Sequence, residues 1–128
     1  MTRTYPALVI EIDKVVDEVV TILVEGITVR CFASYCPMRI EVGKTYEVEF
    51  EITLPDELCV LAVSRESSQI NMIDNGLSCD LSGFLDGSTF RSFVDFHDQD
   101  IHYEYPHLNE HYIQIRIQRI DVIFCQLV

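Results

Sequence analysis

The sequence predicts an all-β protein built on one small barrel, and three observations lead to this prediction. Apolar and polar residues alternate with a period of two in residues 45–54 and 112–118, as in strands that bury one face. Glu25-Gly26 and Asp86-Gly87 are short turn sequences between apolar runs, which is typical of β-hairpins. The apolar positions then change parity near Gln118-Arg119, which indicates a bend in the last strand.

The first third of the chain predicts two strands joined by a turn, and the second of them also begins a hairpin. Apolar residues from Ile12 to Leu23 have helical spacing, but most of them are β-branched, which favours strands. We therefore expect two strands with a turn near Asp17-Glu18. The hairpin has its strands at 19–24 and 27–33, on either side of Glu25-Gly26.

The middle of the chain begins with a clear strand and becomes ambiguous after it. Residues 45–54 place alternate apolar side chains on one face, and Pro55-Asp56 ends the strand. Residues 58–63 fit a buried strand and a helix segment equally well. Residues 64–75 are polar and predict a loop with at most one short helix.

The second half predicts another hairpin and the bent last strand. Residues 79–96 form the hairpin, with Asp86-Gly87 as a type I′ turn. Residues 112–118 alternate again, and the inward set after the bend is Ile120, Val122 and Phe124. A bend of this kind lets one strand pass from one side of a small barrel to the other.

These hairpins, the alternating strands at 45–54 and 112–124, the bent strand and the long irregular connection together resemble an OB-fold. The resemblance implies one Greek-key barrel of about six strands, with at most one short helix, over residues 1–128 as a single domain. OB-fold proteins often bind nucleic acids or sugars, but a shared architecture does not transfer a function.

The charge balance limits the partners of this chain. Nine basic residues stand against 21 acidic ones, for a net charge of −12, and the basic residues are scattered. Nucleic acids and anionic membranes need a basic surface, so both are disfavoured, and a basic protein partner, a cation or simple solubility is favoured. No apolar run is long enough to span a membrane, and we expect a cytoplasmic location.

Cysteine usage agrees with that location. The five cysteines are an odd number and contain no Cys-x-x-Cys pair, so we expect buried free thiols in a reducing compartment. They are Cys31, Cys36, Cys59, Cys79 and Cys125.

All four histidines fall within residues 97–111: His97, His102, His107 and His111. Imidazole is a common ligand of transition metals and a common pH switch. The spacings of five, five and four match no metal motif, so a divalent metal would require this loop to fold around the ion. The alternative is an exposed polar connection between two barrel strands.

Two further groups are candidates for contact with a partner. Glu47, Glu49 and Glu51 project from one face of a predicted strand, where they could dock on a cationic protein or form a solvated face balanced by Arg116. Tyr103 and Tyr105 could lie in an interface or cap the mouth of the barrel.

The sequence contains no recognisable catalytic motif, so we expect a binding protein rather than an enzyme. The leading hypothesis is a small acidic cytoplasmic domain that recognises another protein, in its sharpest form an inhibitor or immunity-type protein against a basic partner such as a nuclease. A second hypothesis is a metal- or small-ligand-binding domain that uses residues 97–111. The third is a structural subunit that pairs with copies of itself through an exposed barrel edge.

Overall fold

The alternating segment in the middle of the chain forms strand β4 (Thr45–Thr53), which has nine residues. In this computed structural model, which describes residues 3–64, 70–73 and 76–128, Tyr46, Val48 and Phe50 point inward and are buried. One end of β4 pairs with β1 (Tyr5–Ile12), and nearly its whole length pairs with β11 (Arg119–Leu127). Strand β4 therefore joins the two ends of the chain.

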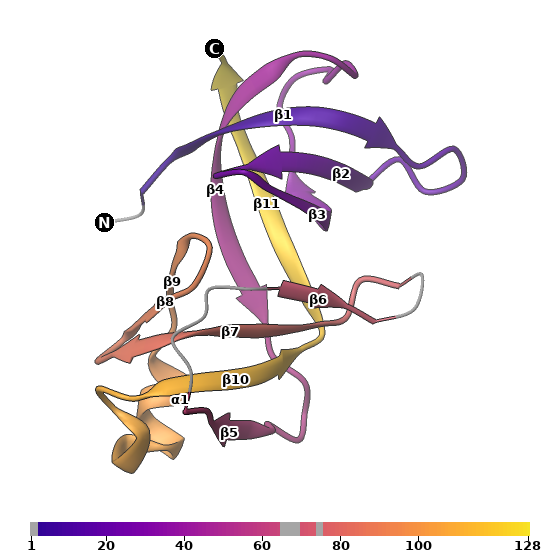
Figure 1. Cartoon of the computed structure of the whole chain (residues 1–128). Helices are drawn as coiled ribbons and strands as arrows, with labels where there is room; N and C mark the ends of the chain where they lie inside the picture. The colour runs from indigo at the N-terminus through magenta and orange to yellow at the C-terminus, as the bar shows by residue number, and fades with distance from the viewer. Residues whose placement is uncertain (1–2, 65–69, 74–75) are drawn as a thin grey trace.

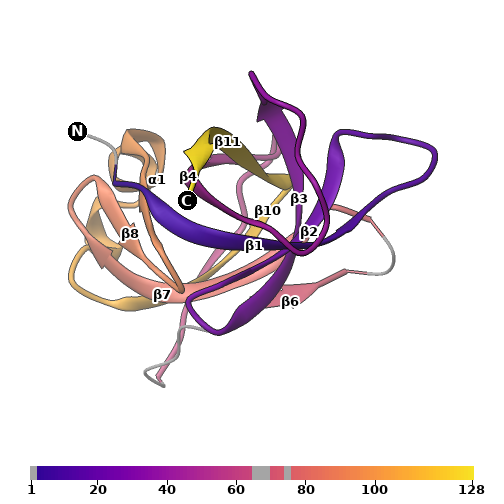
Figure 2. The same ribbon diagram turned by 90° about the horizontal axis from the view of Figure 1, so that it is seen from above.

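A closed barrel results when the N-terminal hairpin completes the circle. Strands β2 (Val19–Val24) and β3 (Ile27–Tyr35) follow β1, and the order around the barrel is β1-β2-β3-β11-β4. The β3–β11 pair is parallel and the others are antiparallel. Figure 2 shows β1, β2 and β3 curving around β11. The predicted all-β fold with a small barrel is confirmed, and the barrel is consistent with the OB-like resemblance.

A second, six-stranded sheet lies between β4 and β11 in the sequence and beside the barrel in space (Figure 1). Its order is β5-β10-β7-β8-β9, with β6 also paired to β7. Its members are β5 (Val60–Ala62), β6 (Ile70–Met72), β7 (Cys79–Asp86), β8 (Thr89–Arg91), β9 (Asp95–His97) and β10 (Tyr112–Ile117). The described chain thus has eleven strands instead of about six. The predicted hairpin at 79–96 covers β7, β8 and most of β9, and a strand was one of the two alternatives for the segment that contains β5. Strands of three residues are too short to show a period, which is why the sequence did not separate a second sheet from the barrel.

The predicted bend near Gln118-Arg119 is present, but its role differs from the expectation. Strand β10 ends at Ile117 in the second sheet, and β11 begins at Arg119 in the barrel. The change of parity therefore moves the chain from one sheet to the other. It does not carry one strand around a single barrel.

The two hairpin turns differ from each other. Glu25 and Gly26 both have positive φ, at 51° and 75°, as a type I′ turn requires. In the second hairpin Asp86 pairs with Thr89, which leaves Gly87-Ser88 as the two-residue loop. Only Gly87 has positive φ there, so this turn fits type II′ and corrects the predicted type I′ turn.

The ambiguous segment and the polar segments of the sequence form short strands and helices. Residues 58–63 contain β5, whose Leu61 is 57% exposed, so the segment is neither helical nor buried. Residues 64–75 contain β6, while 65–69 and 74–75 lie outside the described residues. Helix α1 (Gln99–Glu104) and the 3-10 turn η1 (Pro106–Leu108) connect β9 to β10. Within the described chain, no helix has the length and apolar character needed to cross a membrane.

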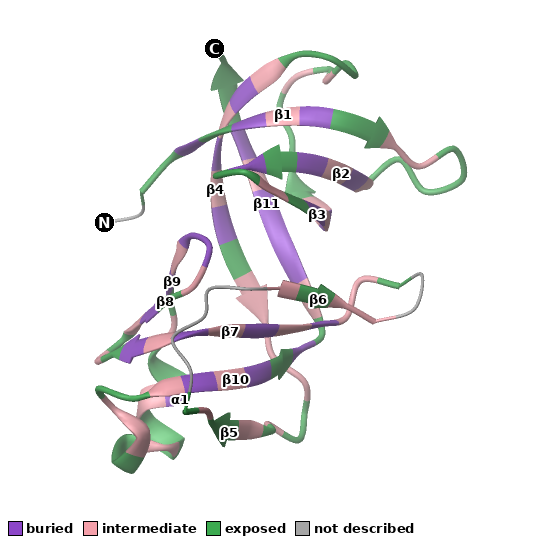
Figure 3. Cartoon of the chain, viewed as in Figure 1, coloured by how far each residue is buried: buried purple, intermediate pink, exposed green. Residues whose placement is uncertain are grey.

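Buried residues lie on strands of both the barrel and the second sheet (Figure 3), and they form one core in which aromatic side chains join the two. Phe50 of β4 lies with its ring centroid 6.1 Å from that of Phe93 and 6.4 Å from that of Phe96. Tyr5 of β1 packs on Phe50, and its hydroxyl accepts a 3.0 Å hydrogen bond from the Asp95 backbone N–H. The two sheets are therefore fixed to each other by buried rings.

We expect Gly83→Ala to destabilise the protein by about 3 kcal/mol, the upper end for overpacking a well-packed core. Gly83 is buried in β7, and a Cβ there would lie 2.9 Å from Ser92 Cα and closer still to the Arg91 carbonyl oxygen. Both neighbours are backbone, so neither can yield as a flexible side chain could. Urea unfolding measures the loss. Gly76→Ala is the matched control, because the nearest atom to its added Cβ is 3.8 Å away. Equal effects of the two substitutions would contradict this account.

Candidate functional site

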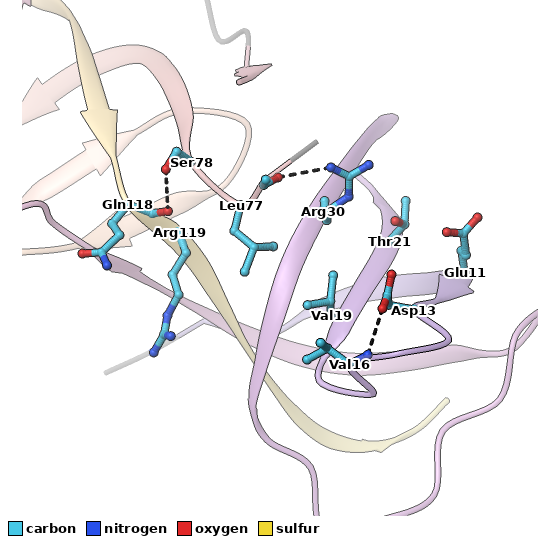
Figure 4. A pocket seen from close by; sticks show the side chains of 11 residues that line it. Glu11, Asp13, Val16, Val19, Thr21, Arg30, Leu77, Ser78, Gln118 and Arg119 are labelled. Atoms are coloured by element: carbon cyan, nitrogen blue, oxygen red, sulfur yellow. Dashed lines mark hydrogen bonds between the residues drawn. The ribbon is translucent and has the colours of Figure 1, made fainter. Parts of the chain in front are cut away.

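A groove of about 660 Å³ lies where the outside of the barrel meets the second sheet (Figure 4). Cross-strand pairing fixes its floor, because directly paired residues point to the same side of a sheet. Glu11 pairs with Thr21, and Thr21 pairs with Arg30, which makes one outward row across β1, β2 and β3. Val19 stands on the same outer face, beside this row.

The wall of the groove comes from the second sheet. The segment of residues 76–78, which leads into β7, runs alongside the barrel face. The Arg30 guanidinium spans the junction and donates a 3.1 Å hydrogen bond to the Gly76 carbonyl oxygen. On the other side, the Ser78 hydroxyl donates to the Gln118 carbonyl oxygen at 3.2 Å. Contacts from both sheets therefore hold the wall in place.

Arg119 occupies the β11 end of the groove and is fixed from two sides. Its guanidinium carbon lies 4.3 Å from the centroid of the Phe32 ring. Its Nε lies 2.7 Å from Asp121 Oδ1, an ionic contact whose alignment is outside that of a hydrogen bond. The Asp121 carboxylate is buried and also accepts a 2.5 Å hydrogen bond from the Thr53 hydroxyl. Because a buried carboxylate needs such partners, Asp121 and Arg119 position each other.

Carboxylates occupy the opposite end of the groove. Glu11 is exposed on β1, and Asp13 follows in the loop between β1 and β2. Asp13 Oδ2 accepts hydrogen bonds from the backbone N–H groups of Val16 at 2.8 Å and Val15 at 3.0 Å. These bonds favour the ionised form and lower the pKa of Asp13 below 3.8. This end of the groove therefore stays negative at neutral pH.

A second feature is the acidic row on β4, formed by Glu47, Glu49 and Glu51. Glu47 and Glu49 are half-buried and Glu51 is exposed. The strands that neighbour β4 are β1 and β11, neither of which carries Arg116, and Glu51 lies opposite Asp121. Arg116 instead pairs with Asp80 on the second sheet, at 2.8 Å. The expected balance of the row by Arg116 is therefore wrong.

No ion pair found among the described residues includes a member of the acidic row. The ion pairs there engage other carboxylates: Glu41, Asp80, Asp86, Asp95 and Asp121. The row is thus an outward line of negative charge that the described cations do not neutralise.

The two tyrosines singled out in the sequence have different environments. Tyr103 on α1 is 83% exposed. The Tyr105 hydroxyl donates a 3.0 Å hydrogen bond to the Leu58 carbonyl oxygen and so anchors the helix to the segment before β5. Both belong to the connection between β9 and β10, whereas the acidic row belongs to the barrel. The structure does not bring the two predicted contact groups together on one element.

The four histidines are spread over four different structural positions. His97 ends β9, His102 is in α1, His107 is in η1 and His111 precedes β10. His97 Nδ1 lies 3.3 Å from the Thr89 hydroxyl, and His111 Nδ1 lies 2.9 Å from the Asn109 carbonyl oxygen. In the described chain, which includes this whole window, no three His, Cys, Asp or Glu side chains gather as a metal site. The window also connects two strands of the second sheet, not two barrel strands.

All five cysteines are free thiols, but only Cys31 and Cys79 are buried. Burial raises the pKa of Cys79 to about 12 and raises that of Cys31 well above its usual value. Cys125 is exposed beside the acidic row. Its pKa is raised first by partial desolvation and then by the charges of Glu49 and Glu47. The Cys125 thiol therefore reports on the field of that row.

Sequence reasoning did not find the groove. Its floor depends on pairing between strands far apart in the chain, and its wall belongs to a second sheet whose predicted strands were assigned to the barrel. One signal was available: Asp121 lies within the apolar last strand two residues after Arg119, and a buried carboxylate in a strand requires a nearby cation.

The fold and this groove define a small all-β barrel protein with a second sheet and a charged groove at their junction. Residues 3–125 match the family described as Uncharacterised conserved protein UCP019853, and the chain belongs to that family. Comparisons with curated proteins and with solved structures found no significant match.

Replacing Glu47 and Glu49 together with Gln is expected to speed alkylation of Cys125 at pH 8.5 by about two- to fivefold. A raised pKa keeps the thiolate fraction low, so removing two of its causes lowers the pKa and raises that fraction. Neutral iodoacetamide and mass spectrometry of the modified peptide measure the rate. Glu51→Gln is the control, because Glu51 is not among the causes of the shift. An unchanged rate in the double variant would show that the row does not act on Cys125.

We expect Arg119→Met, which breaks the Arg119–Asp121 pair, to lower the free energy of unfolding by about 2 kcal/mol. This loss is smaller than for a fully buried pair, because the arginine is partly exposed. The substitution leaves the buried Asp121 carboxylate without its cation. Adding Asp121→Asn removes that charge and should recover at least half of the loss. Arg116→Met, in a more exposed pair, is the control and should cost under about 1 kcal/mol. Urea unfolding decides the matter, and equal losses in the single and double variants would rule out the coupling.

Proposed function

We propose that this chain is a binding domain that recognises a basic protein partner through the acidic row on β4. The observation that carries the proposal is the row itself: three outward carboxylates on one strand, outside every ion pair of the described residues. The net charge of −12 adds a long-range field of the same sign.

The physical basis of such recognition is electrostatic complementarity. Alternate residues on one face of a strand are about 7 Å apart, so the three carboxylates form a regular line. A line of this kind can meet the cationic cleft of an enzyme that binds phosphates and occupy it by imitating the charge of its substrate. An inhibitor or immunity-type role against such an enzyme is the most specific form of the proposal. Complementary charges speed encounter and lose strength as salt screens them.

Three further features support the proposed location, scaffold and contact surface. Five free cysteines fit a reducing compartment, which favours the cytoplasm. The strand order and the parallel β3–β11 pair support an OB-like Greek-key barrel as the scaffold. The exposed Tyr103 is available for a separate contact, while Tyr105 serves the fold.

Binding to lysozyme, used as a basic probe protein, tests the row. We expect the variant with Gln at positions 47, 49 and 51 to bind about tenfold more weakly at low salt, from about 0.5 kcal/mol for each charge. Isothermal titration calorimetry at roughly 20 mM and roughly 200 mM salt measures the affinity. The affinity should fall at the higher salt concentration, because salt screens the attraction between the charges.

The matched control carries Gln in place of Glu18, Glu25 and Glu57, which are exposed elsewhere and change the net charge equally. We expect this variant to retain binding within about twofold. Acetylated lysozyme, whose lysines are neutral, should bind neither protein well. Equal losses in the two triple variants would reduce the effect to net charge and reject the row as a recognition surface.

A further inference from the structure

We propose that the acidic row recognises an arginine side chain of its protein partner, which lies across Ile123 with its guanidinium between the Glu49 carboxylate and the Tyr35 ring. The inference rests on the proposed function, because it names the chemical group that the same row would bind. It stands on the register of three strands, on a carboxylate and a ring left open in that register, and on an arginine of the chain that fills the neighbouring row.

Three outward side chains form one line across neighbouring strands of the barrel. Glu49 of β4 pairs with Ile123 of β11, and Ile123 pairs with Tyr35 of β3. A bulge at Ser34 brings Tyr35, instead of Ser34, opposite Ile123. Paired residues point to the same side of a sheet, so the three side chains are neighbours in turn. Ile123 is half-buried and Tyr35 is 59% exposed, so the line runs from a carboxylate over an aliphatic side chain to an accessible ring.

The carboxylate and the ring of this line have no partner within the described part of the chain. Glu49 belongs to no ion pair there, and Tyr35 makes no ring contact and no hydrogen bond through its hydroxyl. Arg119 lies beyond the other end of the row, where it is already paired with Asp121. The line is therefore open to a cation from another molecule.

The neighbouring row shows how such a line binds a cation. There Asp121 of β11 pairs with Phe32 of β3, and Arg119 joins the two. The Arg119 guanidinium carbon lies 4.3 Å from the centroid of the Phe32 ring, and its Nε lies 2.7 Å from Asp121 Oδ1. Glu49 and Tyr35 offer the same two groups, a carboxylate and a ring, beside this row. An arginine supplied by a partner would repeat the arrangement that the chain makes with its own.

Arginine fits this line better than lysine does. The planar guanidinium stacks on aromatic rings, binds a carboxylate through two N–H groups and is more weakly hydrated than an ammonium. It can therefore lie on Ile123 and Tyr35 while it holds Glu49. Both cation–π contacts of the described chain also use arginine, over the rings of Phe32 and Tyr5. A lysine ammonium would bind the carboxylate but keep more of its water, and so would gain less from the ring.

Two peptides that differ in one cation test the proposal. Acetyl-Lys-Gly-Arg-Gly-Lys-amide and acetyl-Lys-Gly-Lys-Gly-Lys-amide carry the same charge, and their alternate cations have the spacing of roughly 7 Å that separates the carboxylates of the row. NMR titration of the isotopically labelled protein at about 20 mM salt measures both affinities. We expect the arginine peptide to bind about three- to fivefold more tightly than the lysine peptide.

Substitutions at the ring locate this preference. Tyr35→Ser should remove it and leave the affinity for the lysine peptide within about twofold, because only the guanidinium uses the ring. Tyr35→Phe keeps a ring and should retain the preference. Tyr103→Ser is the matched control and should also retain it, because Tyr103 is 83% exposed on α1 and lies outside the barrel.

Substitutions at the carboxylate test the other side of the line. Glu49→Gln should weaken the arginine peptide about threefold or more. Glu18→Gln, which removes one exposed charge from the loop between β1 and β2, is the matched control and should change the affinity by less than about twofold. Urea unfolding establishes that each variant is folded.

The outcomes distinguish a failure of this inference from a failure of the proposed function. If the variant with Gln at positions 47, 49 and 51 binds both peptides as the parent protein does, the row is not a binding surface and both proposals fail. If that variant loses both peptides, but the parent protein binds them equally or Tyr35→Ser keeps the preference, the row stands and the arginine line is overturned. Binding of neither peptide by the parent protein would also overturn the line, and binding to lysozyme would then decide the proposed function alone.

Discussion

The rest of the structure depends on the single residue Gln118, at which the backbone leaves the second sheet and enters the barrel. Ile117 is buried in one sheet and Ile120 in the other, so the inward parity must change between them. The Gln118 N–H donates to the Thr53 carbonyl oxygen at 2.9 Å, and its own carbonyl oxygen accepts from the Ser78 hydroxyl. The chain leaves the barrel at Thr53 and returns at Arg119, and these two residues pair directly. The whole second sheet is therefore an insertion between two adjacent positions of the barrel.

This arrangement explains why the charged groove forms at the junction. An insertion whose two ends meet must lie close to the barrel face beside them, and here residues 76–78 run along the outside of β3. The polar backbone and side chains of the crossing cannot be buried without partners. Arg30, Ser78 and the Arg119–Asp121 pair supply these partners, and they line the groove as a result.

The sequence predicted those elements whose residues carry a long period or a specific turn. These predicted elements are strands β4, β10 and β11, the hairpin at Glu25-Gly26 and the bend at Gln118. The sequence placed β10 and the hairpin at 79–96 in the single barrel, and four strands of three residues have no measurable period, so the division into two sheets was not predicted. The acidic row could be predicted because its residues lie on one strand. The groove could not, because its members come from β1, β2, β3, β11 and the insertion, and only pairing in space unites them.

One cross-strand row connects the two candidate surfaces. Glu51 pairs with Asp121, Asp121 with Phe32, and Phe32 with Val19, from β4 through β11 and β3 to β2. Asp121 shares the outward face of the acidic row, yet it is buried because Arg119 covers it from above the Phe32 ring. A cation recruited to neutralise one carboxylate thus ends the negative surface and begins the basic end of the groove. The local pairing of Arg119, more than the net charge of the chain, sets the boundary between a surface suited to cations and one suited to anions.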